Sequence, residues 1–533
     1  MTSPQSRSRS RRVPSHIAVR VAHAVLGGLV ATGWLLLPLA RAGTEAPAGA
    51  AREAGAGAPA EAPAAVTAQD GTATGDLVPP LVAAGAAGAV AVYGYGRRRR
   101  RATTRTTPGG DPALTPLPEL DRQARRLLVE TDDCTRVCAE ELDVAAERSA
   151  GDALEPFVYD LRHAQAALAA AFRLRQRLDE AEAAGTGADP AGDEDDRRDV
   201  LEEIVALCQD AGERLDTAAP GFDQIRALER NAVAALESAE ARFREAGART
   251  RAAEATLAAL HERYAPAAFL PVAGHAEQAK DRLLFTTSHL NQARQYADRG
   301  DGAKAAAHLR AAEGALAQAS DLADGVERLA GELASAAAGL PGAVAAAEAA
   351  RDAALALPPD TRAGLVGALG HTESALSAVR HETAAGPHDP LEALRRVTEA
   401  AAGLAAAGGG DVPDGRGHAL APAHSALGGA ACFIGTHRGA VGSEARTRLA
   451  EARRLLGPDP VPLSEVLRAD GLAREARRLA ERDVRAYGNP SGGRGGAGAG
   501  GAVLGGILLG DGEGGPMSYG GPRTRGRRGA YFT

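Results

Sequence analysis

Apolar residues recur at intervals of three and four along most of the chain from residue 117 to residue 487, with Arg, Glu and Asp between them. One such series runs through Leu154, Phe157, Leu161, Ala164, Leu168 and Phe172. This spacing places the apolar side chains on one face of an amphipathic helix and the charged ones on the other. The pattern therefore predicts a chain built from long helices.

Turn-forming residues interrupt the helical pattern and predict helices of roughly 20 to 40 residues. The expected breaks are Gly185–Asp196, Pro220-Gly221, Pro266 with Pro271, Gly300-Asp301, Pro341, Pro358-Pro359, Gly386-Pro387, Gly408–Pro413, and Pro458 with Pro460. Three of these turns carry an aspartate suited to capping the next helix, namely Asp301, Asp389 and Asp459.

Long helices joined by short loops fold back antiparallel to bury their apolar stripes. The expected fold is therefore all-α, with antiparallel, coiled-coil-like hairpins and bundles. We divide it into two helical regions, 117–265 and 266–487.

Two apolar segments precede the helices. Residues 1–42 have a basic start, an apolar run and the small-x-small sequence Ala40-Arg41-Ala42, which is the order of a secretory signal peptide. Residues 43–76 are rich in Ala, Gly, Pro and acid and predict a disordered extracytoplasmic linker. Residues 77–96 form an uncharged run of about 20 residues, enough to cross a bilayer. A buried helix of a soluble protein is the alternative for this last run.

An arginine cluster follows the second apolar run directly and opens a polybasic linker at 97–116. Its members are Arg97, Arg98, Arg99, Arg100 and Arg101. Positive residues beside a span stay in the cytoplasm, so the helical region is expected to be cytoplasmic on a cell-membrane protein. The chain then spans once if the signal is cleaved, and twice if it remains as a signal anchor. We expect the five arginines to contact lipid headgroups.

The apolar run also carries small residues at every fourth position, Ala83, Ala87 and Ala91. Such a face allows two helices to approach closely in a membrane, which makes a homo-oligomer through the span a possible arrangement.

Charge and composition narrow the classes of function. The chain has 61 Lys and Arg against 68 Asp and Glu, which argues against a general nucleic-acid-binding protein. Its only lysines are Lys280 and Lys304, and neither stands in a P-loop or a Ser-x-x-Lys motif. Aromatic residues are few (eight Phe, eight Tyr, one Trp), which suits a helical interior of Ala, Leu and Val better than a β-sheet.

Candidate metal and redox residues are sparse. Cys134 and Cys138 share one helix face, but a metal site would need further ligands at suitable spacing. We interpret both, with Cys208 and Cys432, as buried free thiols. His261-Glu262 and His381-Glu382 begin zincin-like sequences without the second histidine. No catalytic residue, metal site or cofactor is expected.

Two charged segments remain. The acidic run Asp193–Asp196 suits either a cation or, by our interpretation, the amino end of the following helix. The tail 488–533 is rich in glycine and predicts disorder. It contains an arginine cluster near two tyrosines, an arrangement that can bind nucleic acid, although we favour a solvated tail. The residues are Arg523, Arg525, Arg527 and Arg528, with Tyr519 and Tyr531.

Several segments resemble one family. They are LPELDRQARRLLVETDD from Leu117, AAFRLRQRLDE, FDQIRALERNA, VAGHAEQAKDRLLFTTSHLNQARQ, RGAVGSEARTRLAEA and GGAVLGGILLG. Over about four fifths of its length the chain resembles the cytoplasmic part of actinobacterial TPM-domain membrane proteins. The resemblance implies a signal peptide, an extracytoplasmic TPM domain, one span, a helical region and a Gly-rich tail. Here only residues 43–76 stand in place of the TPM domain, so the resemblance brings no residue for catalysis or metal binding.

The sequence therefore predicts a membrane-anchored, non-catalytic scaffold or interaction protein, whose partners are membrane lipid and an unidentified protein rather than nucleic acid. One alternative is an accessory subunit of a membrane or extracytoplasmic enzyme, either a TPM-like protein or a protease. Another is an enzyme with a site that no motif reveals.

Overall fold

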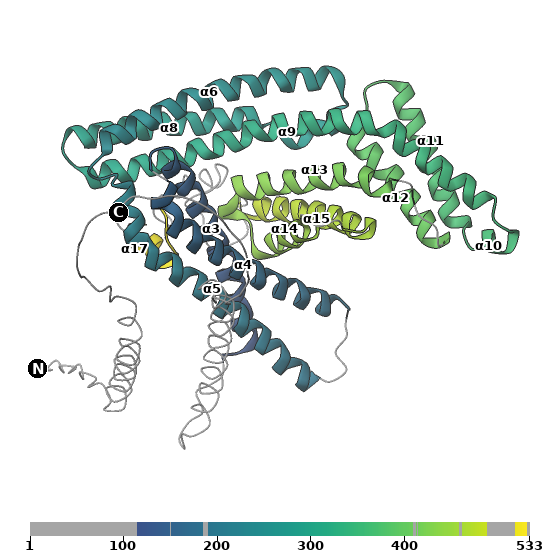
Figure 1. Ribbon diagram of the computed structural model, residues 1–533, viewed down its shortest axis with the longest axis horizontal. Coiled ribbons are helices and arrows are strands. Elements are labelled where there is room, and N and C mark those ends of the chain that lie inside the picture. The colour runs from purple at the N-terminus through teal and green to yellow at the C-terminus, as the bar shows by residue number, and fades with distance from the viewer. Residues whose placement is uncertain are drawn as a thin grey trace, which may run out of the picture. The chain divides into compact units, whose positions relative to one another are not determined.

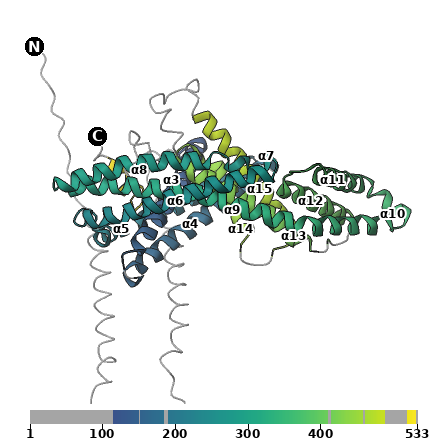
Figure 2. The ribbon, with the colours of Figure 1, turned by 90° about the horizontal axis from the view of Figure 1, so that it is seen from above.

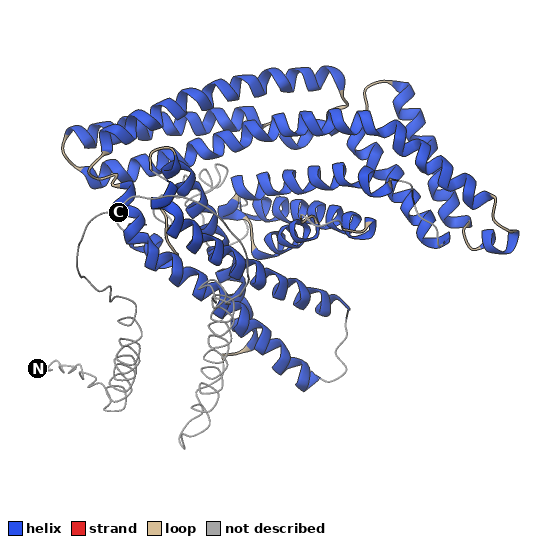
Figure 3. Cartoon of the chain, viewed as in Figure 1, coloured by secondary structure: helices blue, strands red, loops and turns tan. Residues whose placement is uncertain are grey.

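The structure is a computed structural model that describes residues 115–149, 151–184, 190–408, 412, 414–457, 461–487 and 518–529. All regular elements in these ranges are helices, and no strand occurs among them (Figure 3). This confirms the all-α fold class. The expected signal peptide, linker and span lie within residues 1–114, outside the described part of the chain, and remain predictions.

The first group of helices is a three-helix bundle of α3 (Leu117–Ala146), α4 (Gly151–Ala184) and α5 (Pro190–Arg226), shown in Figure 1. Their apolar stripes meet in two clusters. One cluster contains Leu128, Leu168, Phe172, Leu201 and Ile204, and the other contains Cys134, Cys138, Leu161, Leu215 and Phe222. The predicted helical periodicity thus describes the buried face of this bundle.

The second group is a layer of long helices, α6 (Ala232–Arg263), α8 (His275–Asp298) and α9 (Gly302–Leu355), which lie side by side (Figures 1 and 2). The short elements α7 (Pro266–Phe269) and η2 (Leu270–Val272) connect the first two. The packing crosses residue 265, where the sequence suggested a division, since α6 contacts both α8 and α9.

Helix α9 has 54 residues and is therefore about 80 Å long. Among the described helices it is the one that is long and apolar enough to cross a membrane by length and composition. A core helix meets the same test, and the Leu333 and Ala336 side chains are fully buried in a cluster with residues of α6 and α12.

The third group follows α9. Helices α10 (Pro359–Ala363), α11 (Val366–Ala385) and α12 (Pro390–Gly408) come next, and α12 packs on α9. The remaining elements are α13 (Gly415–Thr436), η3 (Arg438–Ala440), α14 (Ser443–Leu455) and α15 (Leu463–Tyr487). Helices α13, α14 and α15 contact one another, and α14 also contacts α3 and α4.

Most expected breaks are confirmed, and two expected caps form. The Asp301 carboxylate accepts a hydrogen bond from the Lys304 N–H at 3.2 Å, and Asp389 accepts one from the Glu392 N–H at 3.1 Å. Each aspartate thus satisfies a backbone donor that the first helical turn leaves free. Asp459 lies outside the described residues.

Two expected breaks are wrong. Pro220 lies inside α5 and Pro341 inside α9. A proline removes only one helical hydrogen bond, and burial of flanking residues such as Phe222 and Leu340 favours continuing the helix. Helix α5 ends later, at Arg226, where Ala227 takes a positive φ of 44°.

The loop expected at Gly185–Asp196 is also shorter than predicted. Helix α5 begins at Pro190, a residue that suits the first turn because it lacks an N–H. The acidic run Asp193–Asp196 therefore lies in the first turns of α5, where the helix dipole favours negative charge.

Candidate functional site

The terminal segment, Ser518–Gly529, docks on the first bundle, and its helix α17 (Pro522–Gly529) contacts α3 and α5. This corrects the expectation of disorder for these twelve positions, 518 to 529. We call the residues that receive the segment the docking site. They are Cys134 and Cys138 of α3, Phe157 of α4, and Gly212, Asp216 and Phe222 of α5.

Tyr519 anchors the segment and is fully buried. Its ring stacks on Phe222, with centroids 4.5 Å apart, and meets Phe157 edge-on at 5.8 Å. Its hydroxyl donates a hydrogen bond to the Phe157 carbonyl oxygen at 2.9 Å. Burial raises the pKa of Tyr519, so the hydroxyl keeps the proton that it donates. The aromatic slot therefore satisfies both the apolar body and the polar tip of the side chain.

Asp216 holds the start of α17 from the neighbouring helix α5. Its carboxylate accepts hydrogen bonds from the backbone N–H groups of Arg523, at 3.2 Å, and Thr524, at 2.8 Å. The Arg523 guanidinium donates a third bond at 3.3 Å. Asp216 thus acts as an N-cap supplied by a distant part of the chain, and its negative charge suits the positive end of the helix dipole.

Glycines allow the two backbones to approach closely. A Cβ atom on Gly521 would overlap the Gly212 carbonyl oxygen, and one on Gly212 would lie 2.9 Å from the Pro522 Cδ atom. Gly520 has a φ of 141°, a conformation that favours glycine, and its N–H donates to the Cys138 Sγ atom at 3.3 Å. The contact therefore depends on glycine in both the segment and the docking site.

Cys134 and Cys138 line the docking site as thiols. The Arg525 guanidinium lies 3.7 Å from the Cys134 Sγ atom. Burial raises the pKa of Cys134 to about 11 and raises that of Cys138 further. Both thiols are fully buried against the segment, where they contribute packing and hydrogen bonding.

The other two cysteines lie elsewhere. Cys208 is buried in the first bundle and Cys432, in α13, is half-buried; burial raises the pKa of each to about 11. Among the described residues no group of His, Cys, Asp and Glu is arranged to hold a metal ion.

Buried ion pairs connect the helices. The Arg446 guanidinium, on α14, donates to Asp132 at 2.5 Å and to Asp133 at 2.8 Å, both on α3. The same side chain donates to two backbone carbonyl oxygens and is fully buried. Arg395 of α12 pairs likewise with Asp470 of α15 at 2.9 Å. These arginines fix one helix against another and leave no guanidinium directed at a ligand.

A further set joins three helices. Arg226, at the end of α5, lies 3.2 Å from Glu141 of α3 and 2.5 Å from Glu313 of α9. All three side chains are buried. An arginine between two carboxylates satisfies charges that would otherwise be costly to bury.

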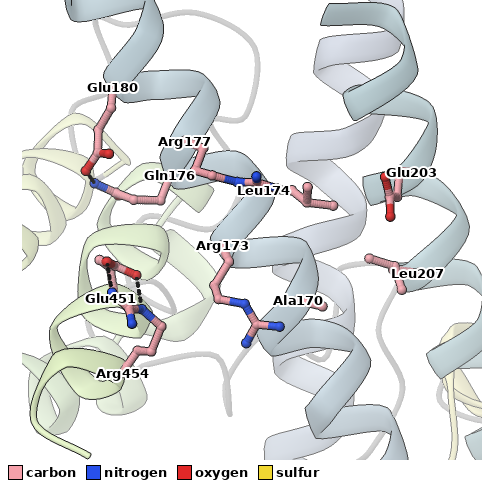
Figure 4. Close-up of a pocket in the computed structure, with 10 residues that line it drawn as sticks. All are labelled: Ala170, Arg173, Leu174, Gln176, Arg177, Glu180, Glu203, Leu207, Glu451 and Arg454. Atoms are coloured by element: carbon pink, nitrogen blue, oxygen red, sulfur yellow. Dashed lines mark hydrogen bonds and ion pairs between the residues drawn. The ribbon is translucent and has the colours of Figure 1, made fainter. Parts of the chain in front are cut away.

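A cleft of about 540 Å³ opens between α4, α5 and α14 (Figure 4). It is lined by Ala170, Arg173, Leu174, Gln176, Arg177, Glu180, Glu203, Leu207, Glu451 and Arg454. Arg454 bonds Glu451 at 2.8 Å and lowers the pKa of that carboxyl, so Glu451 is ionised near neutral pH. None of the ten lining residues is a Ser, Thr, Cys, His, Lys or Tyr. The polar part of its lining therefore consists of arginines, glutamates and one glutamine.

The remaining sequence candidates are dispersed. Arg97, Arg98, Arg99, Arg100 and Arg101 lie outside the described residues. Glu382 of α11 pairs with Arg396 at 2.5 Å, and His261 of α6 rests edge-on against Phe269. In the tail, Arg523 and Arg525 contact the docking site, and the side chains of residues 526–533 are outside the described part.

Sequence reasoning missed Tyr519, Asp216 and Gly212 as parts of one site. One signal was available. The stretch SYGGPRTR carries a tyrosine, a proline and a threonine within otherwise glycine-dominated sequence, which is a local departure from low complexity.

Two curated relatives share most of this chain. It is 31% identical over 457 residues to UPF0603 protein MT2410 and, equally, to UPF0603 protein Rv2345, both from Mycobacterium tuberculosis. The match covers 77% of this chain and 66% of each relative, so the chain spans just under two thirds of their length. Neither a protein-family model nor a solved structure matches it. This identity shows that the chain is a homologue of these UPF0603 proteins, whose names state no activity.

Proposed function

We propose that this protein is a membrane-anchored, non-catalytic scaffold whose helical array faces the cytoplasm and binds a protein partner. The observation that carries the proposal is the use of buried charge. The Arg226, Arg395 and Arg446 guanidinium groups each join carboxylates of other helices. Buried charge thus fixes these helices relative to one another, and a scaffold needs helix faces held in fixed positions.

The layer of α6, α8 and α9 offers a surface suited to a partner. It carries partly exposed ion pairs, such as Arg294 with Glu240 and Arg249 with Asp324. Leu284 of α8 and Val233 of α6 are 72% and 66% exposed. Because the core of a contact surface is apolar and its rim polar, we expect partner contact at these two exposed apolar side chains.

The membrane anchor rests on the sequence of residues 77–101. An uncharged run closed by five arginines is the pattern of a span with its basic end in the cytoplasm. The accessory-subunit alternative shares this anchor and differs in the partner, which would be a membrane or extracytoplasmic enzyme.

The topology is tested with the full chain in cell membranes. A protease site and an epitope tag are inserted at residues 185–189, between α4 and α5, because the terminal segment itself is docked. We expect cleavage in inverted vesicles and protection in intact protoplasts. Cleavage in intact protoplasts would place the array outside the cell and refute the proposal. The matched control replaces Arg97–Arg101 with alanine, which should mix the two orientations.

The partner is tested by photo-crosslinking in living cells. A photoreactive residue replaces Leu284 or Val233 in the full chain, and a third variant carries it at the buried Leu333. We expect a discrete protein adduct from the exposed positions alone. No adduct from either exposed position, or the same adducts from Leu333, would count against a scaffold that uses this layer.

A further inference from the structure

We propose that the docking site on α3, α4 and α5 is a peptide-binding site, that the terminal segment is its tethered ligand, and that the same segment of a second copy of this chain can occupy it. This inference goes beyond the scaffold function and does not depend on the membrane anchor.

The docking site recognises successive residues of the segment by different means. Phe157 and Phe222 hold the Tyr519 ring, and the Phe157 carbonyl oxygen holds its hydroxyl. Gly212 accepts only glycine at position 521. A slot for one aromatic side chain next to a strict requirement for glycine is sequence-specific recognition, and packing of a generic apolar tail would need neither.

Backbone recognition completes the fit. The Asp216 carboxylate binds the N–H groups of Arg523 and Thr524, and the Cys138 thiol binds the N–H of Gly520. These contacts fix the direction of the segment and start α17. The Arg523 side chain is 66% exposed, so the segment lies at the surface of the bundle on that side.

The length of the connection between α15 and the segment allows the segment to come from the same chain or from a neighbouring copy. The 30 residues 488–517 separate Tyr487, at the end of α15, from Ser518. Fully extended, 30 residues cover up to about 100 Å. A segment from the same chain and one from a neighbouring copy would make identical contacts, and exchange of an identical element is a low-cost route to association.

Tethering favours binding of the chain's own segment over binding of a segment from another molecule. A short linker gives an effective concentration on the order of millimolar, so the chain's own segment competes strongly with any free peptide. The affinity of the docking site for a free peptide can therefore be measured only when the chain's own segment is displaced. Gly521 of the segment and Gly212 of the docking site can each be substituted, so that either the segment or the site is disabled separately.

The experiment uses the full chain in detergent micelles and a fluorescein-labelled peptide of residues 516–529, PMSYGGPRTRGRRG. Gly521→Leu expels the internal segment and leaves the docking site intact. Gly212→Leu leaves the segment intact and blocks the docking site at Pro522. The matched control is Gly331→Leu, on the exposed face of α9, where an added Cβ meets nothing within 4 Å.

We expect the Gly521→Leu protein to bind the peptide at least about 100-fold more tightly than the wild-type or Gly331→Leu protein does. The Gly212→Leu protein should not bind it. A peptide with Tyr519→Ala should bind Gly521→Leu about 100-fold more weakly, because burial of the ring is lost. A Gly521→Leu protein with native helix content that ignores the peptide would overturn the proposal.

A second measurement covers the case in which Gly521→Leu does not fold. A protease site is placed at residues 500–505 of the otherwise native chain, and the connection is cut under native conditions. We expect excess labelled peptide to replace the cut fragment. A fragment that never exchanges, or a protein that unfolds on cutting, would show that the segment is a permanent part of the core.

The second copy is tested by mixing differently tagged Gly212→Leu and Gly521→Leu chains. Only the mixed pair combines an intact segment with an intact docking site. Co-purification of the mixed pair should exceed that of either variant with itself by at least about tenfold. Equal co-purification in all three mixtures would refute exchange between copies.

Discussion

The α3–α5 bundle and the α6–α8–α9 layer reach a packed interior in different ways. The bundle concentrates its aromatic contacts in one place, where Phe157, Phe222 and Tyr519 meet. The layer instead packs alanines and leucines along the length of α9, where Ala305, Ala312 and Leu309 are fully buried, and its ring contacts form a separate group around His308. Stability in the bundle therefore depends on a few residues, whereas in the layer it is spread over many small contacts.

Charge shows a related contrast. The bundle is joined to its neighbours by pairs with a buried arginine, such as Arg446 with Asp132 and Arg226 with Glu313 of the layer, whereas other pairs of the layer, such as Arg294 with Glu240, are partly exposed. A buried arginine leaves stranded carboxylates when it is removed, but an exposed pair is screened by water. Single substitutions should therefore separate the two regions clearly.

The largest effect is expected for Arg446→Met. The substitution leaves the partly buried carboxylates of Asp132 and Asp133 without their buried partner, at a cost of about 3 kcal/mol in the free energy of unfolding. Denaturant unfolding of the full chain measures it. The matched control is Arg294→Met in the layer, whose pair with Glu240 is partly exposed and should contribute less than about 1 kcal/mol. Equal losses in both variants would refute this contrast.

Tyr519→Ala should rank second, with a loss of about 3 kcal/mol, because it empties the aromatic slot between Phe157 and Phe222. Tyr519→Phe should lose about 1 kcal/mol for the single hydrogen bond. Tyr487→Ala serves as control, since that side chain is 49% exposed and its removal should cost under about 0.5 kcal/mol. Deletion of residues 518–533 should match or exceed Tyr519→Ala, and an unchanged unfolding midpoint would show that the bundle does not need the segment.

The third largest effect is a loss of stability at acid pH caused by His275 of α8, in the layer. Burial lowers the pKa of His275 to about 4, against about 6.5 in an unfolded chain. The unfolded state then binds the extra proton between these values, so stability falls as pH decreases from about 6.5 to about 4. From pH 7 to pH 5 the loss should be about 2 kcal/mol for this residue. His275→Leu should lose correspondingly less over that interval, and parallel pH profiles for the two proteins would contradict this assignment.

The smallest effect should be a gain. Gly331 lies on the exposed side of α9 with nothing within 4 Å of an added Cβ. Gly331→Ala should stabilise the protein by up to about 1 kcal/mol, because alanine favours the helix more than glycine does. Thermal unfolding measures the shift. A destabilised variant would mean that this face of α9 is covered by another surface.

The sequence predicts local features of the helices better than features that depend on packing. Periodicity and turn residues predict the helices and the caps at Asp301 and Asp389, because these depend on neighbours within a few positions. The end of α5 at Arg226 was missed, since no Gly or Pro marks it. Pro341 was misread because packing along α9 outweighs the local preference of one residue.

The docking site lay beyond such reasoning for a different reason. Tyr519 and Phe157 are 362 positions apart, and glycine-rich sequence around Tyr519 has no helical or strand periodicity. Asp216 looks like one more charge on an amphipathic helix, although its partners are backbone N–H groups of a distant segment. The position of Cys138 on an apolar helix face predicts that it is buried, but it does not predict the hydrogen bond that Cys138 accepts from the Gly520 N–H.

The distance along the chain between Phe222 and Tyr519 also has a consequence for biosynthesis. Helix α5 ends at Arg226, and Tyr519 is added 293 positions later (519 − 226). At about 5–20 residues per second, the ribosome needs roughly 15–60 s for that stretch. During this time the nascent bundle has an unfilled aromatic slot, which a chaperone or the tail of a finished copy can reach first. A ribosome-bound chain arrested before residue 518 should therefore present Phe157 and Phe222 in a state that the completed protein covers.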